Sequence, residues 1–224
     1  MLKRAKFLGG ALFSAAVLAA PAARAETEQQ VTVDGARKTL TDLRHDKAFG
    51  NAEQLLRKAR GVMIVPRLIK GGFIFGAEGG NGVVMVRGAH GWSDPAFYGI
   101  GAGSFGLQAG LEQSELILLI MTQKVLDGVL HDDFKIGAQA GIAVVTLGSG
   151  VEGAMGGASL PDIVVWSSST GLYGGLTIDG SVIKAEPKSD AAFYGRPVKA
   201  RDVLFGAGGS ARAAGLRREI NAFG

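Results

Sequence analysis

The chain has 224 residues, of which 36 are glycine and none is cysteine, and it carries 24 basic and 20 acidic side chains. Without cysteine, the fold has no disulfide, no thiolate metal site and no cysteine nucleophile. Residues 1–25 hold four of the basic residues and no acidic one, so the rest of the chain has 20 of each sign. The basic isoelectric point therefore gives no argument for nucleic-acid binding.

The N-terminus has the three parts of a secretory signal. A basic start at residues 3–6 precedes an apolar stretch from Phe7 to Ala20 and a small-residue cleavage site at 23–25. The apolar stretch is short for a membrane span, so a retained anchor is the less favoured alternative. We expect cleavage near Ala25, export to the periplasm or the medium, and a single domain over residues 26–224.

Two helices are predicted over residues 31–60, separated by a break at 49–51. Gly61 should end the second helix, and residues 62–65 should form a short strand that stops at Pro66. The apolar positions with helical spacing are Ala36, Leu40, Leu43, Leu55, Leu56 and Ala59.

Strands and tight turns are predicted from there onward. A hairpin is expected to join residues 72–77 to 82–87 around a turn at Glu78–Asn81. The elements expected after it are a turn at Ser93-Asp94-Pro95, an aliphatic strand buried on both faces at 114–121, a helix at 123–130, strands at 134–147, 163–168 and 172–183 with a loop at 148–157, and helical segments at 200–205 and 211–221. This order predicts the α+β class: a curved antiparallel glycine-rich sheet or barrel-like core with N- and C-terminal helices.

One glycine motif resembles a dinucleotide-binding site without its context. Gly101–Gly106 matches G-x-G-x-x-G, but residues 107–121 read as strand where a helix is needed, and the expected acidic position falls near Lys124. The same segment lacks one glycine of a nucleophile elbow. We expect close packing of strands here and no cofactor.

The histidines give no catalytic or metal pattern. His45, His90 and His131 lie far apart in the sequence, and His131-Asp132-Asp133 reads more simply as a polar helix end, since adjacent side chains point in different directions. A hydrolase would need a polar cluster such as Glu115 near Asp127. An outer-membrane barrel would need ten-residue alternating strands with aromatic girdles, a pattern this chain does not show.

A series of segments resembles a known family. They are Ala59–Pro66, Lys70–Gly76, Gly79, Gly80, Gly82, Trp92–Phe97, Gly106–Gly110, Ser114–Leu118, Ser167–Leu172 and Phe193–Gly195. In this order and spacing, from about Arg37 to Gly195, they resemble the SYLF domain family, also called the yeast actin-binding or Ysc-type domain.

The resemblance implies a lipid- or membrane-associating module with no enzymatic activity, no cofactor and no small-molecule substrate. The family is associated with phosphoinositide-rich membranes in eukaryotic members and with actin in fungal ones. No SH3 or FYVE companion is present in this sequence, and a signal peptide stands where eukaryotic members carry a membrane segment. Scaffolding and actin binding are therefore not carried over.

A run of basic residues supplies the candidate lipid-binding site. Between Gln54 and Ala77 the chain has five basic residues and no acidic one. Each could contribute roughly 1 kcal/mol at an anionic surface, and two apolar side chains within the run could insert into it. The alternative is that the apolar pair belongs to the core. The candidate residues are Arg57, Lys58, Arg60, Arg67, Leu68, Ile69 and Lys70.

A second function stays open from the residues alone. Residues 88–190 hold eleven acidic and four basic side chains, which would suit a basic protein partner. The alternative to lipid binding is therefore a structural or protein-interaction module of the periplasm, with an envelope protein as partner.

Overall fold

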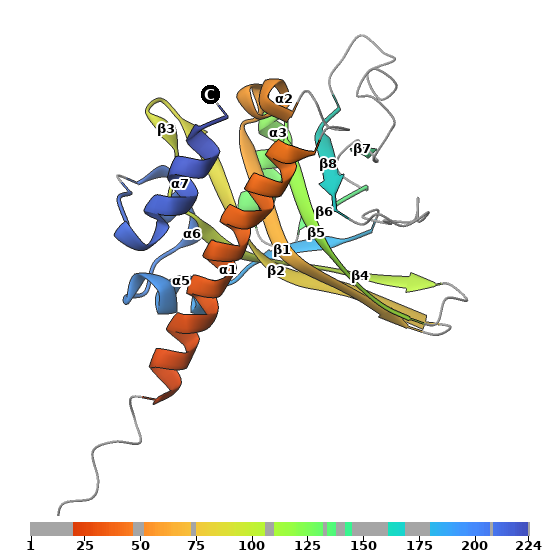
Figure 1. The fold of residues 1–224 in the computed structure, drawn as a ribbon, viewed down its shortest axis with the longest axis horizontal. Helices are drawn as coiled ribbons and strands as arrows, with labels where there is room; N and C mark the ends of the chain where they lie inside the picture. Colours follow the sequence, from red (N-terminus) through yellow and green to blue (C-terminus); the bar gives the residue numbers. More distant parts are fainter. Residues whose placement is uncertain are drawn as a thin grey trace, which may run out of the picture.

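The computed structural model describes residues 20–46, 52–72, 75–105, 110–131, 134–137, 142–144, 161–168, 180–206 and 208–223. A curved sheet forms the centre of the molecule, with the long helix α1 crossing one of its faces and the C-terminal helices beside it (Figure 1). The apolar part of the predicted signal and the predicted loop at 148–157 lie outside the described residues.

The elements confirm the predicted α+β class. They are α1 (Ala20–His45), α2 (Ala52–Lys58), β1 (Gly61–Gly72), β2 (Phe75–Gly88), β3 (Gly91–Trp92), β4 (Ala96–Phe105), β5 (Gly110–Ile120), α3 (Gln123–Leu130), β6 (Phe134–Lys135), β7 (Ile142–Val144), β8 (Ile163–Ser167), β9 (Val182–Ala185), α5 (Pro187–Tyr194), α6 (Ala200–Phe205), the 3₁₀ turn η2 (Ala211–Ala213) and α7 (Ala214–Asn221).

The strands form one sheet in the order β6-β9-β4-β2-β1-β5-β8-β7, and β3 pairs with β2. The pairs are antiparallel except for β7 with β8. The far ends of the four long strands β1, β2, β4 and β5 project beyond the helices (Figure 1). Among the described residues, no helix is both long enough and apolar enough to cross a bilayer.

Each face of the sheet carries its own hydrophobic core. On β5, Ile117 and Leu119 pack with side chains of α1, α2 and α7, whereas Leu116 and Leu118 pack with side chains of α3 and α6. Alternate residues of a strand point to opposite faces, so a strand covered on both sides must be apolar throughout. The prediction of a doubly buried strand at 114–121 is confirmed.

The sequence predicted that the first strand stops at Pro66. This prediction is wrong, because β1 continues through Pro66 to Gly72. The pairing of β1 with β5 shifts register between Val65 and Leu68, so Pro66 lies in a bulge. A bulge leaves residues outside the hydrogen-bond ladder and accommodates a residue without an N–H group.

The bulge explains why glycines lie inside β2. A Cβ atom on Gly82 would come within 2.2 Å of the Ile64 carbonyl oxygen, and one on Gly80 within 2.5 Å of the Arg67 carbonyl oxygen. The predicted turn at Glu78–Asn81 is therefore wrong, because these residues continue β2 beneath the bulge. The hairpin instead joins β1 to β2, with Gly72 opposite Gly76.

Among the helices, α3 and α6 have the bounds predicted from the sequence, and α7 with η2 covers the last predicted segment. The helix α5 was missed. Its eight residues include no clear apolar stripe, yet Pro187 begins it and Gly195 ends it with φ 68°. Proline at a helix start and a left-handed glycine after its end are the expected boundary residues.

Candidate functional site

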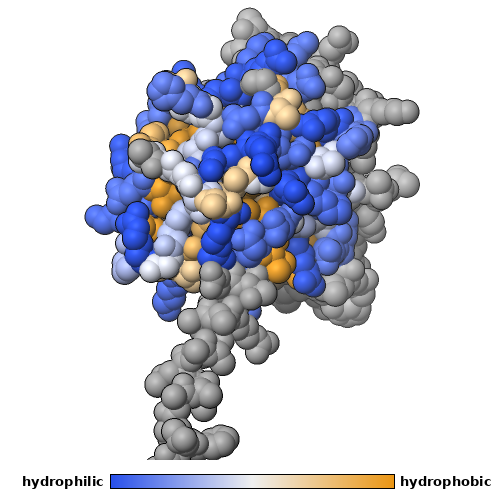
Figure 2. All heavy atoms as spheres, turned by 60° about the vertical axis from the view of Figure 1, so that its left-hand side comes forward, coloured by the Kyte–Doolittle hydropathy of each residue, from blue (hydrophilic) through white to orange (hydrophobic). Residues whose placement is uncertain are grey.

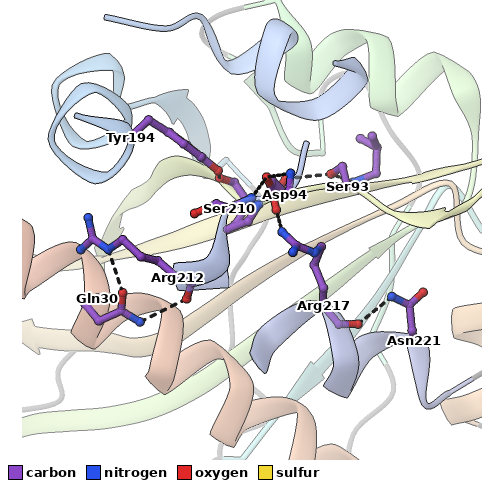
Figure 3. A network of polar contacts seen from close by, with 11 residues as sticks. Gln30, Ser93, Asp94, Tyr194, Ser210, Arg212, Arg217 and Asn221 are labelled. Carbon is purple, nitrogen blue, oxygen red and sulfur yellow. Dashed lines mark hydrogen bonds and ion pairs between the residues drawn. The ribbon is translucent and has the colours of Figure 1, made fainter. Parts of the chain in front are cut away.

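Asp94, in the predicted turn before β4, holds the C-terminal part of the chain in place (Figure 3). Its carboxylate is 3% exposed and accepts hydrogen bonds from the backbone N–H groups of Gly209 (2.7 Å) and Ser210 (2.9 Å). Arg217 of α7 forms an ion pair with the same carboxylate. A buried charge requires such partners, so this turn fixes residues 208–217 against the sheet.

Two further contacts tie the neighbouring helices together. The Tyr194 hydroxyl donates to the Pro95 carbonyl oxygen (2.6 Å). Arg212 lies over the Phe193 ring at 4.5 Å from its centroid and donates to the Phe193 carbonyl (2.7 Å) and to Gln30 of α1 (3.2 Å). Burial raises the pKa of Tyr194, so the phenol stays a donor.

Asp190 of α5 is a second buried carboxyl group in this region. It accepts a hydrogen bond from the Phe97 N–H (2.9 Å) and has no exposed surface. Burial raises its pKa to about 6, against the opposing effect of the Phe97 hydrogen bond and with a smaller contribution from the charge of Glu186. Unlike Asp94, Asp190 forms no ion pair among those recorded in the described part of the chain.

These contacts border a half-open cleft of about 460 Å³ between the end of α5, α6 and the glycine-rich residues Gly206 and 208–210. This volume lies within the usual range for small-molecule sites. Phe193, Val198 and Val203 supply apolar lining, and the exposed side chains of Arg196 and Asp202 lie at its border. The lining also includes Asp94 and Arg212, which are bonded within the protein, so the cleft combines apolar surface with one exposed charge of each sign at its border.

Beside the cleft, α6 presents an exposed aromatic ring next to a cation. Phe205 is 54% exposed, the Arg201 guanidinium lies 5.5 Å from its ring centroid, and Lys199 at the start of the helix is exposed. We call these three residues the α6 surface. Figure 2 turns the C-terminal helices toward the viewer and shows hydrophobic residues reaching the surface in patches bordered by hydrophilic ones.

The predicted lipid-binding residues separate into two groups. Arg57, Lys58 and Arg60 are exposed at and just after α2, and we call them the α2 corner. Arg57 donates to the Phe223 carbonyl oxygen (3.2 Å) and lies 3.9 Å from Glu53. Arg60 reaches the Gln123 side chain at 3.5 Å.

The other group begins in the bulge of β1, where Arg67 is exposed, and continues to Lys70. Lys70 is ten residues past Arg60, roughly 33 Å along an extended strand, and it pairs across the sheet with Glu78 and Glu112. Burial raises the pKa of Glu78, while the charge of Lys70 opposes this shift. The described structure therefore does not bring the five predicted cations together.

The two apolar candidates have different surroundings. Leu68 is 2% exposed and belongs to the core that includes Met63 and Ile100, as in the alternative that the sequence left open. Ile69 points to the other face of the strand and is 37% exposed. The bulge before Leu68 decides which of the two faces inward.

Among the described residues, the two carboxylates considered for a hydrolase have separate partners, whereas Gly106, Asp132 and Asp133 lie outside the described residues. Glu115 accepts a hydrogen bond from Thr39 of α1 (3.1 Å), whereas Asp127 accepts one from Gln123 of α3 (2.9 Å). Residues 101–105 lie in β4. In the described part of the chain, no group of three or more His, Cys, Asp or Glu residues could hold a metal ion.

Comparison with known proteins establishes the family. The family model Ysc84, described as "Las17-binding protein actin regulator", matches residues 101–223, more than half of the chain. The chain belongs to this family, which confirms the resemblance found in the sequence.

Two relatives named SH3 domain-containing YSC84-like protein 1, from Bos taurus and Homo sapiens, are each 30% identical over 154 residues, covering 68% of this chain and 45% of the relative. LAS seventeen-binding protein 3 of Saccharomyces cerevisiae is 26% identical over 156 residues, covering 68% and 34%. The chain thus spans less than half the length of these relatives, and none of the three names is that of an enzyme.

Sequence reasoning missed the α6 surface and the role of Asp94. A signal for the first was present, because residues 191–224 hold six basic and two acidic side chains. The sequence indicated only a turn at Asp94, because its hydrogen-bond partner Gly209 lies 115 positions away.

Proposed function

We propose that this protein is a non-enzymatic module that associates with anionic lipid in the cell envelope, after export directed by its N-terminal residues. Its family membership and the names of its relatives give no support to catalysis. The observation that carries the proposal is the α6 surface, where the half-exposed ring of Phe205 lies beside Arg201 and Lys199 is exposed at the start of the same helix.

The chemistry of this surface suits a lipid boundary. Cations near an anionic membrane contribute about 1 kcal/mol each, and burying an aromatic side chain contributes on the order of 1.5–3 kcal/mol. Two cations and a partly buried Phe205 thus supply about 4 kcal/mol, which corresponds to roughly millimolar affinity. We therefore propose transient, salt-sensitive association.

Sedimentation of the full chain with vesicles tests the proposal. We expect binding to vesicles that contain phosphatidylglycerol, weaker binding to pure phosphatidylcholine, and a decrease as salt rises. The double variant Lys199→Glu, Arg201→Glu should lose at least about tenfold in binding, because each reversed charge replaces an attraction with a repulsion. Phe205→Ser should reduce binding to both kinds of vesicle.

The matched control reverses two charges at the α2 corner, in Arg57→Glu, Lys58→Glu. We expect this variant to keep most of the binding, because the α2 corner has no exposed large apolar side chain among the described residues. Loss of binding in the control but not in the α6 variant would return the lipid contact to the segment predicted from the sequence. Equal binding to neutral and anionic vesicles would remove the electrostatic part of the proposal.

A second candidate function is a protein-interaction module, which is favoured by the family description "Las17-binding protein". Co-purification of a stoichiometric envelope protein, together with absence of vesicle binding, would support it over lipid association.

A further inference from the structure

The cleft between α5, α6, Gly206 and residues 208–210 has walls in which most polar groups are bonded within the protein. The Asp94 carboxylate binds Gly209, Ser210 and Arg217, and the Tyr194 hydroxyl binds Pro95. These contacts join segments that lie far apart in the sequence, so the cleft has a fixed shape and needs no ligand to form it.

Glycines let the cleft wall approach the Asp94 turn. A Cβ atom on Gly208 would lie 2.8 Å from the Asp94 carboxylate, so a side chain there would push the loop away. At Gly209, by contrast, a Cβ atom would meet nothing within 4 Å. Gly208 is therefore closely packed against Asp94. The next residue, Gly209, faces open space and lines the cleft.

Two charged side chains at the cleft are not engaged. Arg196 and Asp202 both border it and are exposed. Neither side chain has a hydrogen-bond or ion-pair partner in the part of the chain that the structure describes, and they are not paired with each other. The cleft thus offers one free cation and one free anion, with Val198 and Val203 as apolar surface nearby.

The signs of these charges restrict the ligand. A simple anion would be attracted by Arg196 but repelled by Asp202, and a simple cation would meet the reverse. A molecule that carries both charges on one small head can satisfy both side chains, with Arg196 as a charge-assisted donor to phosphate oxygens and Asp202 as the acceptor for an ammonium group.

We propose that this cleft binds the zwitterionic phosphoethanolamine head group of a membrane lipid, with the phosphate at Arg196, the ammonium at Asp202 and the glycerol region against Val198 and Val203. The choice of a membrane source rests on the proposed lipid association, because the adjoining α6 surface would hold the cleft at the membrane. Recognition of one head group is separate from attraction to an anionic surface.

Titration of the isotope-labelled full chain with dihexanoyl phosphatidylethanolamine, followed by NMR, tests this proposal with a soluble lipid and no vesicle. We expect saturable shifts of the backbone signals of residues 193–212. Binding of dihexanoyl phosphatidylglycerol, which lacks the ammonium group, should be at least about tenfold weaker, as loss of one charged hydrogen bond implies.

Single variants of the two charged side chains measure separately how much each contributes to lipid binding. Arg196→Ala and Asp202→Asn should each weaken phosphatidylethanolamine binding about tenfold. Asp202→Asn should also reduce the preference over phosphatidylglycerol, whereas Arg196→Ala should weaken both lipids. The matched control is Arg57→Glu, Lys58→Glu at the α2 corner, which changes side chains that do not line the cleft and should leave soluble-lipid binding unchanged.

Equal binding of the two lipids, or shifts confined to residues outside 193–212, would overturn the head-group assignment. Binding of free O-phosphoethanolamine as tight as that of the lipid would overturn the membrane source. Because these measurements use no bilayer, their failure is distinguishable from failure of the proposed vesicle association.

Discussion

Two segments of this protein are rich in cations, and the fold uses them in opposite ways. The segment from Arg57 to Lys70 carries five basic residues without an acidic one, yet β1 spreads them over two ends of a long strand. The C-terminal segment, residues 196–223, interleaves its cations with glycine and acidic residues. It nevertheless places Arg201 over the exposed ring of Phe205, on the same short helix that Lys199 begins.

The difference follows from local geometry. A strand advances about 3.3 Å per residue and points successive side chains to opposite faces, so neighbours in sequence separate in space. A short helix and its flanking turns keep residues of one stretch together. In the C-terminal segment, Arg212 and Arg217 are used inside the protein, which leaves the remaining cations for the surface.

The largest expected change in stability follows from breaking the ion pair between Asp94 and Arg217 in the C-terminal segment. Asp94→Ala should lower the free energy of unfolding by about 3–5 kcal/mol, because it leaves Arg217 partly buried without its carboxylate. Asp94→Asn keeps an acceptor for the N–H groups of Gly209 and Ser210, so its loss of unfolding free energy should be smaller. Urea denaturation followed by circular dichroism measures both.

The matched control in the other segment is Arg57→Ala, which removes a cation with a 60% exposed side chain from the α2 corner. We expect a loss below about 1 kcal/mol, as for exposed ion pairs. Similar losses for Asp94→Ala and Arg57→Ala would contradict the distinction between internal and surface arginines.

A second prediction concerns Asp190, which lacks the guanidinium partner that Asp94 has. Its pKa is raised from 3.8 to about 6 in the folded protein, so between about pH 4 and 6 the unfolded chain loses this proton first. The folded state then binds more protons, and stability falls as pH rises through this window, by up to about 3 kcal/mol. Above about pH 6 the contribution of Asp190 to the free energy of unfolding no longer changes with pH.

Denaturation of wild type and Asp190→Asn across pH 4–7 measures this effect. The difference in unfolding free energy should shift in favour of the variant as pH rises, because asparagine has no proton to lose. A constant difference for Asp190→Asn would refute the linkage.

The smallest expected effect is on vesicle binding, when charges are reversed in the part of β1 that the sequence predicted to contact lipid. Arg67→Glu, Lys70→Glu should change binding to phosphatidylglycerol vesicles by less than about threefold, because Lys70 already faces two carboxylates across the sheet, those of Glu78 and Glu112. A loss as large as that of Lys199→Glu, Arg201→Glu would mean that the strand segment contacts lipid. Circular dichroism checks that the variant folds, since its change places three carboxylates side by side.

Much of the fold was predictable, because local patterns specify it. The helices α3 and α6 follow from apolar spacing, and the doubly buried β5 from an unbroken aliphatic run. The errors at Pro66 and at Glu78–Asn81 share one cause. Proline and glycine read as local stop and turn residues, whereas here they allow two strands to cross closely at a bulge.

The candidate site was less predictable, because its parts come from distant positions. The order of the glycine-rich segments sufficed to identify the family, which the family model confirms. Residue order alone also determined the α+β class and the absence of cysteine chemistry. Only the tertiary structure decided that Leu68 is core, that Asp94 binds a loop 115 residues away, and that Arg201 lies over an exposed Phe205. The physical reason is that strand register and the burial of charge depend on partners that no local pattern contains.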